Sequence, residues 1–261
     1  MSTLKIKGRY YRLYPPEKYL GHAEETLELD TDSTAFLAVD VYGLGFSPDD
    51  HGEAHPYPTM GLPESFEVEK DIVVNHICPA MDAARRADLP VIYLNNSAPR
   101  IAINRSELAK TCLRSNGLDW EEWGSEDTVD PREYVHGNST AVKFSKVVEP
   151  QEGDYLVRKH AYSGFFETRL DGLLRNLNIK TLVCVGFALD ICLHCTMVDA
   201  MNLNYQVLLL RDCAMAMELP GELEGLAFTK RMVLWTEYCV GHSATSADFI
   251  AACDACEGAS G

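Results

Sequence analysis

The chain has 261 residues, of which 46% are hydrophobic, and its formal net charge is -16. This length suits one large α/β domain, and no linker rich in Pro, Gly or Ser divides the sequence. Nucleic acids and anionic membranes require a positive protein surface, so the charge excludes both as partners and leaves a small neutral or cationic molecule.

The beginning of the chain predicts where the protein works. Residues 1–9 carry charges where a signal peptide needs an apolar core, and the longest apolar run, Leu182 to Leu189, is too short to span a bilayer. We therefore expect a cytoplasmic protein. Its nine cysteines are then expected to be reduced thiols.

The first 32 residues are predicted to form an N-terminal arm, followed by a catalytic domain over residues 33–256. Five cations make the start of this arm basic in an otherwise acidic chain: Lys5, Lys7, Arg9, Arg12 and Lys18. Such a segment either lies across another subunit or is a solvated tail. Residues 100–150 have no clear periodicity and are predicted to be an insertion or lid.

Strands and helices are predicted to alternate along the domain. Thr34 to Asp40 is an apolar run that ends in an acid, which is typical of a parallel strand buried on both faces. Further strands are predicted at 90–94, 155–158, 180–186, 206–210 and 231–237, and helices at 68–88, 170–177, 191–203 and 244–253. This order predicts a single-domain, Rossmann-like α/β fold, with a doubly wound, six-stranded, mostly parallel sheet and helices on both faces.

Three of the predicted strands are followed by chemically useful side chains. Ligands of open parallel sheets bind beyond the carboxyl ends of the strands. Asp40 closes the first strand, Lys159 follows the third, and Cys192 lies just past the fourth. Taken singly, these residues could be a turn residue, a surface charge and a small buried hydrophobe. Together, a carboxylate, a cation and a nucleophile at one edge favour a cysteine-dependent hydrolase.

The helix that begins near Cys192 is expected to activate its thiol. Unpaired N–H groups and the positive end of the helix dipole favour the thiolate, and a nearby ammonium group favours it further. The same N–H groups can stabilise the oxyanion of a tetrahedral intermediate.

Three segments resemble the isochorismatase-like cysteine hydrolases: LAVD with Asp40, KHAYSGFFETRLDGLL with Lys159, and VGFALDICLHCTMVDAMNLNYQVLLLRDC with Cys192. The resemblance covers roughly residues 33–255. The segment around Lys159 looks like the branch of this family that cleaves linear ureides of the ureidoacrylate, biuret or triuret type. The resemblance implies a catalytic triad of Asp40, Lys159 and Cys192 in a homo-oligomer, a dimer or a tetramer.

The resemblance also implies the backbone around the nucleophile. It predicts a cis peptide bond between Phe187 and Ala188, and oxyanion donors from the backbone of Cys192 and of Ala188 or Leu189. Two residues depart from the family pattern. Leu189 stands where Thr or Asn is usual, and Tyr42 stands where Gln usually follows the first strand.

The expected reaction cleaves a carbon–nitrogen bond of a small linear ureide or carbamoyl compound through a thioester, and releases ammonia or carbamate. Six side chains are candidates for substrate contact: Tyr42, Phe46, Asn95, Tyr162, Phe165 and Glu218. The aromatic rings offer flat walls for a planar ureide, but they fit a hydrophobic core equally well. Asn95 is also compatible with a turn, and Glu218 with a solvated surface.

Other functions stay open. A metal-dependent nicotinamidase needs histidines beside the second strand, where this chain has Asn95-Asn96-Ser97. Asp49, His51 and His55 could bind a metal, but the glycines and prolines around them argue against a helix that presents both histidines on one face. We therefore expect no metal and no other cofactor. An isochorismatase-type hydrolase of another small substrate remains an alternative, because the triad does not name the substrate.

A different class of function rests on cysteine spacing. Cys192 with Cys195, and Cys253 with Cys256, have the spacing of zinc or thiol redox sites. A zinc-binding or non-catalytic α/β scaffold is therefore the alternative to an enzymatic function. A dinucleotide-binding dehydrogenase requires a glycine-rich turn after the first strand, and the sequence DVYGLGFSP lacks that pattern.

Overall fold

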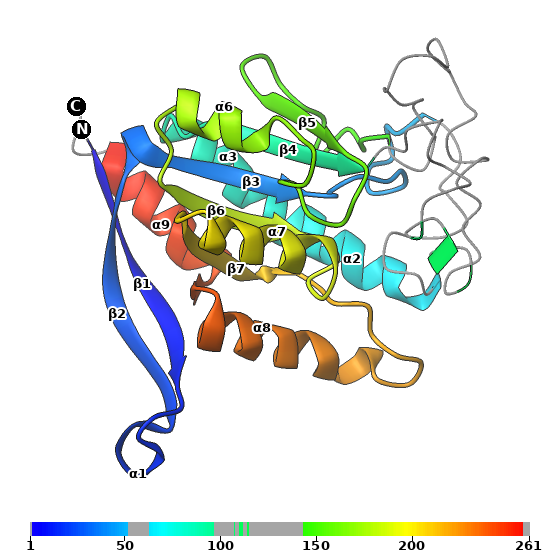
Figure 1. The fold of residues 1–261 in the computed structure, drawn as a ribbon. Helices are drawn as coiled ribbons and strands as arrows, with labels where there is room; N and C mark the ends of the chain where they lie inside the picture. The colour runs from blue at the N-terminus through cyan, green and yellow to red at the C-terminus, as the bar shows by residue number, and fades with distance from the viewer. Residues whose placement is uncertain are drawn as a thin grey trace.

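Within the part of the chain that the structure describes, eight strands form one sheet with helices on both faces (Figure 1). The computed structural model describes residues 2–51, 63–96 and 143–257, together with positions 107, 110, 111 and 114. The strands are β1 (Thr3–Arg12), β2 (Gly21–Asp30), β3 (Thr34–Val39), β4 (Val91–Asn96), β5 (Tyr155–Lys159), β6 (Thr181–Gly186), β7 (Gln206–Ala214) and β8 (His242–Ala244). Their order in the sheet is β2-β1-β8-β7-β6-β3-β4-β5.

The strands from β8 to β5 are parallel to one another, and β3 lies between β4 and β6. The chain leaves β3 towards β4 and β5 on one side, and then returns to β6 on the other side. Ligands of open α/β sheets bind at the point where the strand order reverses in this way. The carboxyl ends of β3 and β6 are therefore the place to look for a site.

Helices cover both faces of the sheet (Figure 1). One face carries α2 (Phe66–Ile72), the π-helical turn Val73–Ile77, α3 (Cys78–Arg86) and α9 (Ser246–Glu257), and the other carries α6 (Leu170–Asn176), α7 (Cys192–Asn202) and α8 (Ala227–Cys239). A short helix, α1 (Pro16–Tyr19), joins β1 to β2, and 3-10 turns lie at Thr31–Ser33, Pro63–Ser65 and Leu223–Gly225.

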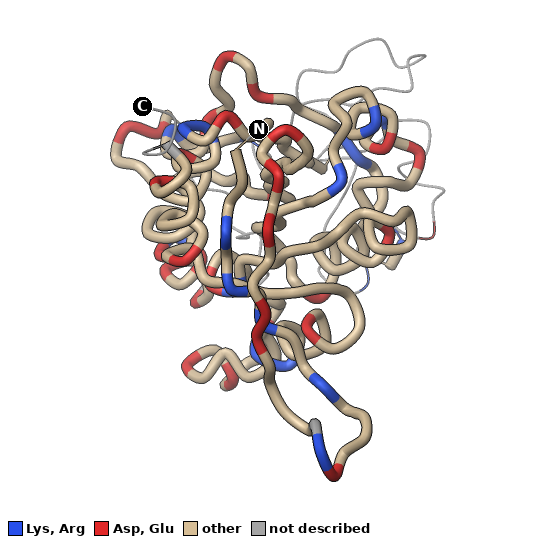
Figure 2. Tube along the Cα trace, turned by 90° about the vertical axis from the view of Figure 1, so that its left-hand side faces the viewer, with Lys and Arg blue, Asp and Glu red and all other residues tan. Residues whose placement is uncertain are grey.

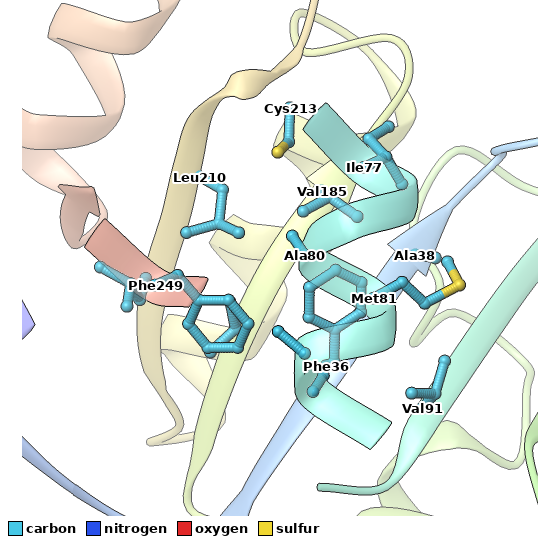
Figure 3. Packing of buried hydrophobic residues seen from close by; sticks show 14 of the residues in the cluster. Phe36, Ala38, Ile77, Ala80, Met81, Val91, Val185, Leu210, Cys213 and Phe249 are labelled. Atoms are coloured by element: carbon cyan, nitrogen blue, oxygen red, sulfur yellow. The ribbon is translucent and has the colours of Figure 1, made fainter. Parts of the chain in front are cut away.

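The central strand β3 is buried on both faces, as its apolar sequence predicts. Phe36 and Ala38 belong to the hydrophobic cluster that contains Met81 of α3 and Phe249 of α9 (Figure 3). Leu37 belongs to the opposite cluster, under α6 and α7. Because side chains alternate along a strand, a strand between two helical layers has no polar face.

The prediction of six strands is wrong in number and in its last member. Residues 231–237 lie in α8, and β8 follows at His242–Ala244. Thr229, Val233 and Thr236 face the interior, and this is the spacing of a helix. Leu234 and Trp235, which are exposed, are also apolar, so the sequence MVLW resembles a strand.

The other two strands come from the N-terminal residues. β1 and β2 pair in antiparallel fashion along their whole length, from Thr3 with Asp30 to Arg12 with Gly21. This hairpin, residues 3–30, joins the parallel strands through antiparallel pairing of Arg9 with Ser243 of β8. Its end at α1 projects beyond the helices and the rest of the sheet (Figures 1 and 2).

Two further predictions concern other parts of the chain. No helix among the described residues is long and apolar enough to cross a membrane. Most of the predicted insertion or lid at 100–150 lies outside the described residues. Its last part packs on the loop after β3, where Asp50 accepts hydrogen bonds from Ser145 Oγ at 3.1 Å and from the backbone N–H of Lys146 at 2.8 Å.

Candidate active site

Asp40 is the residue directly after β3, at the point where the strand order reverses. Its backbone has a φ of 50°, in the left-handed region that few residues other than glycine adopt. The backbone N–H of Asp40 donates to the carbonyl of Leu94 at 2.8 Å, which holds this turn against β4. The carboxyl group is buried, with 1% of the residue exposed.

Lys159 ends β5, two strands away from β3, and its side chain reaches back across the end of β4. Its ammonium Nζ lies 2.8 Å from Asp40 Oδ2, and both side chains are almost completely buried. Burial removes both charges from water, so each group depends on the other for its charge. The predicted pairing of these two strand ends is present in the structure.

Cys192 is the first residue of α7 and is 8% exposed. Its thiol is within hydrogen-bonding reach of both Asp40 and Lys159. The carboxylate, ammonium and thiol therefore meet at one edge of the sheet, although they are far apart in the sequence.

The pKa of the Cys192 thiol is shifted in the opposite direction from the prediction. Burial raises the pKa of Cys192, and the attraction of Lys159 does not compensate for it because Asp40 acts in the opposite direction. The expectation of a resting thiolate is therefore wrong. A helix dipole and one ammonium group do not outweigh desolvation beside a carboxylate.

The ion pair also has shifted pKa values. Burial raises the pKa of Asp40, and the Lys159 ammonium offsets only part of this effect. Burial disfavours the charge of Lys159, but Coulombic attraction to Asp40 and Cys192 keeps the Lys159 pKa above its ordinary value. A carboxylate with a raised pKa is a stronger base than a free aspartate, and it lies next to a thiol that holds its proton.

The turn between β6 and α7 places backbone N–H groups beside Cys192. The Phe187–Ala188 peptide bond is cis, in agreement with the family resemblance. Gly186 before it has a φ of 112°, and a Cβ atom there would lie 2.0 Å from the carbonyl oxygen of Val39. Only glycine fits this position, because β3 passes so close to it.

The structure distinguishes between the candidate oxyanion donors, which are backbone N–H groups after β6. The N–H of Leu189 donates to the carbonyl of Met215 at 2.9 Å, so Leu189 is wrong as a donor. No backbone hydrogen bond within the described residues uses the N–H of Ala188 or of Cys192. These two groups are the ones that remain for an oxyanion.

Asn96 is a site residue that the sequence reasoning did not select. Its Oδ1 accepts a hydrogen bond from Lys159 Nζ, and its Nδ2 donates to the hydroxyl of Tyr42 at 2.9 Å. Its backbone N–H also favours the charged form of Asp40 and so lowers the Asp40 pKa in part. Tyr42 is buried, and burial followed by the nearby Asp40 charge raises the Tyr42 pKa well above its ordinary value. The phenol is therefore a neutral hydrogen-bonding group.

The neighbouring Asn95, which was selected, is buried but faces the other way. Side chains alternate along β4, with Tyr93 in the cluster under α3 and Leu94 in the cluster under α6 and α7. Asn95 lies on the side of Tyr93, and Asn96 lies on the side of Leu94. The two adjacent asparagines marked this strand end as a candidate site. The sequence did not show which of the two side chains faces Cys192.

The predicted aromatic contacts lie in different surroundings. Phe46 is buried and stacks on Phe66 of α2, with ring centroids 5.7 Å apart. Phe165 packs on Tyr205 at 5.9 Å, and Tyr162 is half-buried against the cluster that contains Cys192. Tyr42 is the aromatic candidate with a hydrogen bond into the network around the triad.

Glu218 lies in the loop between β7 and α8, and its side chain contacts the start of α8. Its carboxylate accepts hydrogen bonds from the backbone N–H groups of Thr229 at 2.8 Å and Phe228 at 3.1 Å. These are N–H groups of the first helical turn, which have no partner within the helix. The structure thus gives this buried carboxylate a role as a helix cap.

The sequence offered histidines and paired cysteines as candidate metal ligands. No group of three or more His, Cys, Asp or Glu side chains among the described residues is arranged to hold a metal ion. His55, one of the candidate ligands, lies outside those residues. Cys192 and Cys195 lie in α7, and Cys253 and Cys256 lie in α9.

Comparison with known proteins connects this geometry to a family. The family model described as the isochorismatase domain matches residues 65–235. Ureidoacrylate amidohydrolase RutB of Variovorax paradoxus is 26% identical over 241 residues, which cover 90% of this chain and 87% of the relative. The protein of the same name from Rhizobium rhizogenes is 32% identical over 194 residues, which are 72% of each chain.

Solved structures show the same fold. A cysteine hydrolase from Pseudomonas syringae pv. phaseolicola has a TM-score of 0.66 at 22% identity, and the match covers 87% of this chain and 95% of that one. N-carbamoylsarcosine amidase from Thermoplasma acidophilum has a TM-score of 0.51 at 24% identity, and the match covers 82% of this chain and 96% of that one.

Proposed function

The chain belongs to the isochorismatase family, and we propose that it is a cysteine hydrolase that cleaves a carbon–nitrogen bond of a small linear ureide or carbamoyl compound. The observation that supports this most directly is the buried ion pair of Asp40 and Lys159, 2.8 Å apart, in contact with the Cys192 thiol. A base, a counter-charge and a nucleophile in contact are what acyl transfer through a thioester requires.

The first step combines proton transfer with attack. Asp40 takes the proton of the Cys192 thiol while the sulfur forms a bond to the carbonyl carbon, and the carbonyl electrons move to oxygen. The N–H groups of Ala188 and Cys192 stabilise this oxyanion; one such donor typically lowers the barrier by roughly 3 kcal/mol. Lys159 stays charged throughout and balances the change of charge on Asp40.

The later steps return the proton. When the tetrahedral intermediate collapses, the carbon–nitrogen bond breaks and the leaving nitrogen takes the proton from Asp40. Asp40 then removes a proton from water, which attacks the thioester carbon, and the sulfur leaves and regains a proton. A ureide treated in this way releases carbamate, which decomposes to carbon dioxide and ammonia.

The ureide class of substrate is supported by the relatives and by the pocket residues. Curated relatives that match 72–90% of this chain are ureidoacrylate amidohydrolases. Tyr42 and Asn96 lie beside the triad as neutral hydrogen-bonding groups, which suits an uncharged amide or ureido group. Tyr162 and Phe165 line the same face of the sheet as Cys192 and are proposed as the flat wall for a planar substrate. We place the reaction in the cytoplasm, where a cysteine nucleophile is kept reduced.

The test is ammonia release from a panel of substrates: ureidoacrylate, biuret, triuret, N-carbamoyl amino acids and nicotinamide. We expect turnover of at least one ureide and a loss of about three orders of magnitude or more in Cys192→Ser. The control is Cys195→Ser, which removes a half-buried thiol from the same helix and should leave the rate unchanged. Turnover of nicotinamide alone would overturn the substrate class, and full activity in Cys192→Ser would overturn the mechanism.

A further inference from the structure

The segment after Lys159, residues 160–166, connects the edge of the sheet to the nucleophile, and we call it the lysine loop. Among the described residues β5 pairs only with β4, and β3 and β4 separate it from β6, which precedes Cys192. β5 itself is largely exposed, with Val157 and Lys159 as its buried residues. Because backbone pairing on one side holds β5 only loosely, contacts of the lysine loop must fix the place of its Lys159 end.

Two side chains of α7 bind the lysine loop. The backbone N–H of Gly164 donates to Thr196 Oγ1 at 2.9 Å. Ser163 Oγ donates to Asp199 Oδ2 at 2.5 Å. Thr196 and Asp199 come four and seven residues after Cys192, so these three residues lie on one face of the helix. The helix that begins with the nucleophile therefore carries the attachment points of the lysine loop on the same face.

The Thr196 hydroxyl joins the loop to the backbone of the nucleophile. Besides accepting from Gly164, it donates to the carbonyl oxygen of Cys192 at 2.7 Å. Threonines inside helices commonly donate to the carbonyl four residues back, and Thr236 of α8 makes this bond to Met232 at 3.0 Å. Thr196 adds to it a bond from a separate segment of the chain. Since Thr196 is fully buried between two backbone groups, its hydroxyl has one fixed orientation.

The lysine loop is bonded within itself and packs closely on β4. Ser163 Oγ accepts a hydrogen bond from the backbone N–H of Phe165 at 3.1 Å. The carbonyl of Gly164 accepts one from Thr168 Oγ1 at 2.5 Å. A Cβ atom at Gly164 would lie 2.3 Å from Leu94 Cδ1, so the backbone here lies directly against β4. The attachment to α7 therefore determines where the loop lies as a unit.

The loop also contacts the triad directly. Lys159 Nζ lies 2.8 Å from Asp40 Oδ2, and it donates to the carbonyl oxygen of Ala161, within the loop, at 3.4 Å. The ammonium group therefore has one contact in the triad and one in the loop. A shift of the loop away from α7 moves both the strand end that carries Lys159 and an oxygen that its ammonium binds.

We propose that Thr196 and Asp199 are positioning residues, which hold the lysine loop on the nucleophile helix. They thereby set where the ammonium of Lys159 lies relative to the carboxylate and the thiol. This role rests on the proposed function, because it serves the same triad. Thr196 and Asp199 act on the reacting groups through other residues: through the backbone of Cys192 on one side, and through the loop on the other.

Thr196→Val tests the first attachment, because it keeps the shape of the side chain and removes the hydroxyl. The N–H of Gly164 loses its acceptor and the loop separates from α7. Since a misplacement of about 1 Å can cost roughly 100-fold in rate, we expect kcat/KM to fall by about ten-fold or more. Thr196→Ser keeps the hydroxyl and should retain most of the wild-type rate. Thr236→Val is the matched control: it removes a fully buried hydroxyl with the same bond from α8, and it should leave the rate unchanged.

The pH profile separates positioning from a general loss of structure. Asp40 is faced by Lys159, Cys192 and Tyr42, and Lys159 is the cation that lowers the Asp40 pKa. When the ammonium moves away, Asp40 binds its proton more tightly. The acidic limb of kcat/KM should therefore move to higher pH in Thr196→Val and stay in place in Thr196→Ser. A limb that both variants leave in place would overturn the role of Thr196.

Ser163→Ala and Asp199→Ala test the second attachment from its two sides. Because both break the same hydrogen bond, each should lower kcat/KM by about three-fold or more. The double variant should then be no slower than the slower of the two single variants. Unchanged rates, or losses that multiply in the double variant, would overturn the role of Asp199. This pair leaves the buried hydroxyl of Thr196 intact, so it also tests the loop if Thr196→Val does not fold.

The closing experiment needs no substrate, so it distinguishes failure of the positioning role from failure of the proposed function. Iodoacetamide alkylates thiolates, and Lys159 is the group that lowers the pKa of the buried Cys192 thiol. One pKa unit changes the thiolate fraction about ten-fold, so alkylation of Cys192 at a fixed pH should slow by about three-fold or more in Thr196→Val and Asp199→Ala. Mass spectrometry of the Cys192 peptide measures this rate, and Thr196→Ser should match the wild-type protein.

The outcomes are separate for the two proposals. Equal or faster alkylation of Cys192 in Thr196→Val and Asp199→Ala would overturn the positioning role, whatever the substrate is. Slower alkylation in these variants, in a protein that turns over no ureide, would support the positioning role and overturn the substrate class.

Discussion

Cys192 holds its proton in the resting site, because burial raises the pKa of the thiol. The nucleophile is therefore produced during the reaction and not stored as a thiolate. In the proposed mechanism, the Asp40 carboxylate must therefore accept this proton when the substrate is in place. A thiol protected in this way also reacts slowly with oxidants and alkylating agents, which attack thiolates.

The pH dependence of kcat/KM should report Asp40. Its carboxylate form is the base, so the rate should rise as pH increases through the Asp40 pKa. Because burial raises that pKa, we expect the acidic limb to lie above the value of about 3.9 for a free aspartate. The measurement is kcat/KM between pH 4 and pH 9 with an uncharged substrate. An acidic limb at or below the free value would contradict the assignment.

At the residue scale, the sequence located the triad but not the residues that support it. Asp40, Lys159 and Cys192 follow directly from the rule that sites lie at the ends of parallel strands. Asn96 was missed, because the choice between Asn95 and Asn96 depends on which side chains of β4 point towards α6 and α7 and which point towards α3. Leu189 was misassigned as a donor because its N–H binds Met215, whose position after β7 is set by the tertiary fold.

At the scale of the elements, α8 depends on a cap that comes from the preceding loop. The two N–H groups that bind Glu218 have no other acceptor in the helix. Glu218→Ala should therefore destabilise the protein by about 1 to 2 kcal/mol. If Glu218 acts only as a cap, KM should stay unchanged in this variant.

Urea unfolding and initial rates measure the two effects of Glu218→Ala separately. Glu222→Ala is the control, because Glu222 is an exposed carboxylate of the same loop, and it should change neither quantity. A large rise in KM without loss of stability would instead support the predicted contact of Glu218 with substrate.

The turn after β6 depends on Gly186. An alanine there would place its Cβ 2.0 Å from the Val39 carbonyl oxygen, and it would have to adopt a φ of 112°. We expect Gly186→Ala to destabilise the protein by more than about 3 kcal/mol, or to prevent folding. Gly172→Ala is the control in α6, where no atom lies within 4 Å of the added Cβ. It should stabilise the helix by about 0.5 to 1 kcal/mol, as thermal unfolding would show.

Some strands were predicted correctly from the sequence whereas α8 was not, and this difference has a physical reason. Strands buried on both faces, such as β3 and β6, are recognisable because their whole sequence is apolar. Residues 231–237 of α8 were taken for a strand because exposed Leu234 and Trp235 are as apolar as buried Val233, so that the helical period is hidden.

At the scale of the whole molecule, the doubly wound α/β architecture was predictable from the alternation of strands and helices. The hairpin was not recognised, although residues 3–8 alternate between exposed and buried positions as an edge strand does. Its many charges were interpreted either as an arm across another subunit or as a solvated tail. The partner of those charges, Glu237, is more than 200 positions away in the sequence, and only the fold brings it close.

Glu237 should control how firmly the hairpin is attached. Glu237→Gln keeps the shape of the side chain but removes the charge that Arg9 faces, so we expect a loss of about 1 to 3 kcal/mol. Amide hydrogen exchange in residues 3–30 should become faster, while exchange in β3 and β6 changes little. Glu28→Gln is the control, because its ion pair with Lys5 is exposed on both sides. Unchanged exchange in the hairpin would show that other contacts hold it.

The position of β3 between β4 and β6 also has a consequence for synthesis of the protein. Asp40 and Lys159 leave the ribosome well before Cys192, and β6 completes the centre of the sheet only after both. A nascent or prematurely terminated chain that ends before residue 181 has the acid and the amine but lacks the sulfur and the turn that aims the oxyanion donors. The proposed site can therefore be complete only after nearly three quarters of the chain has been made, and products truncated before Cys192 lack the proposed nucleophile.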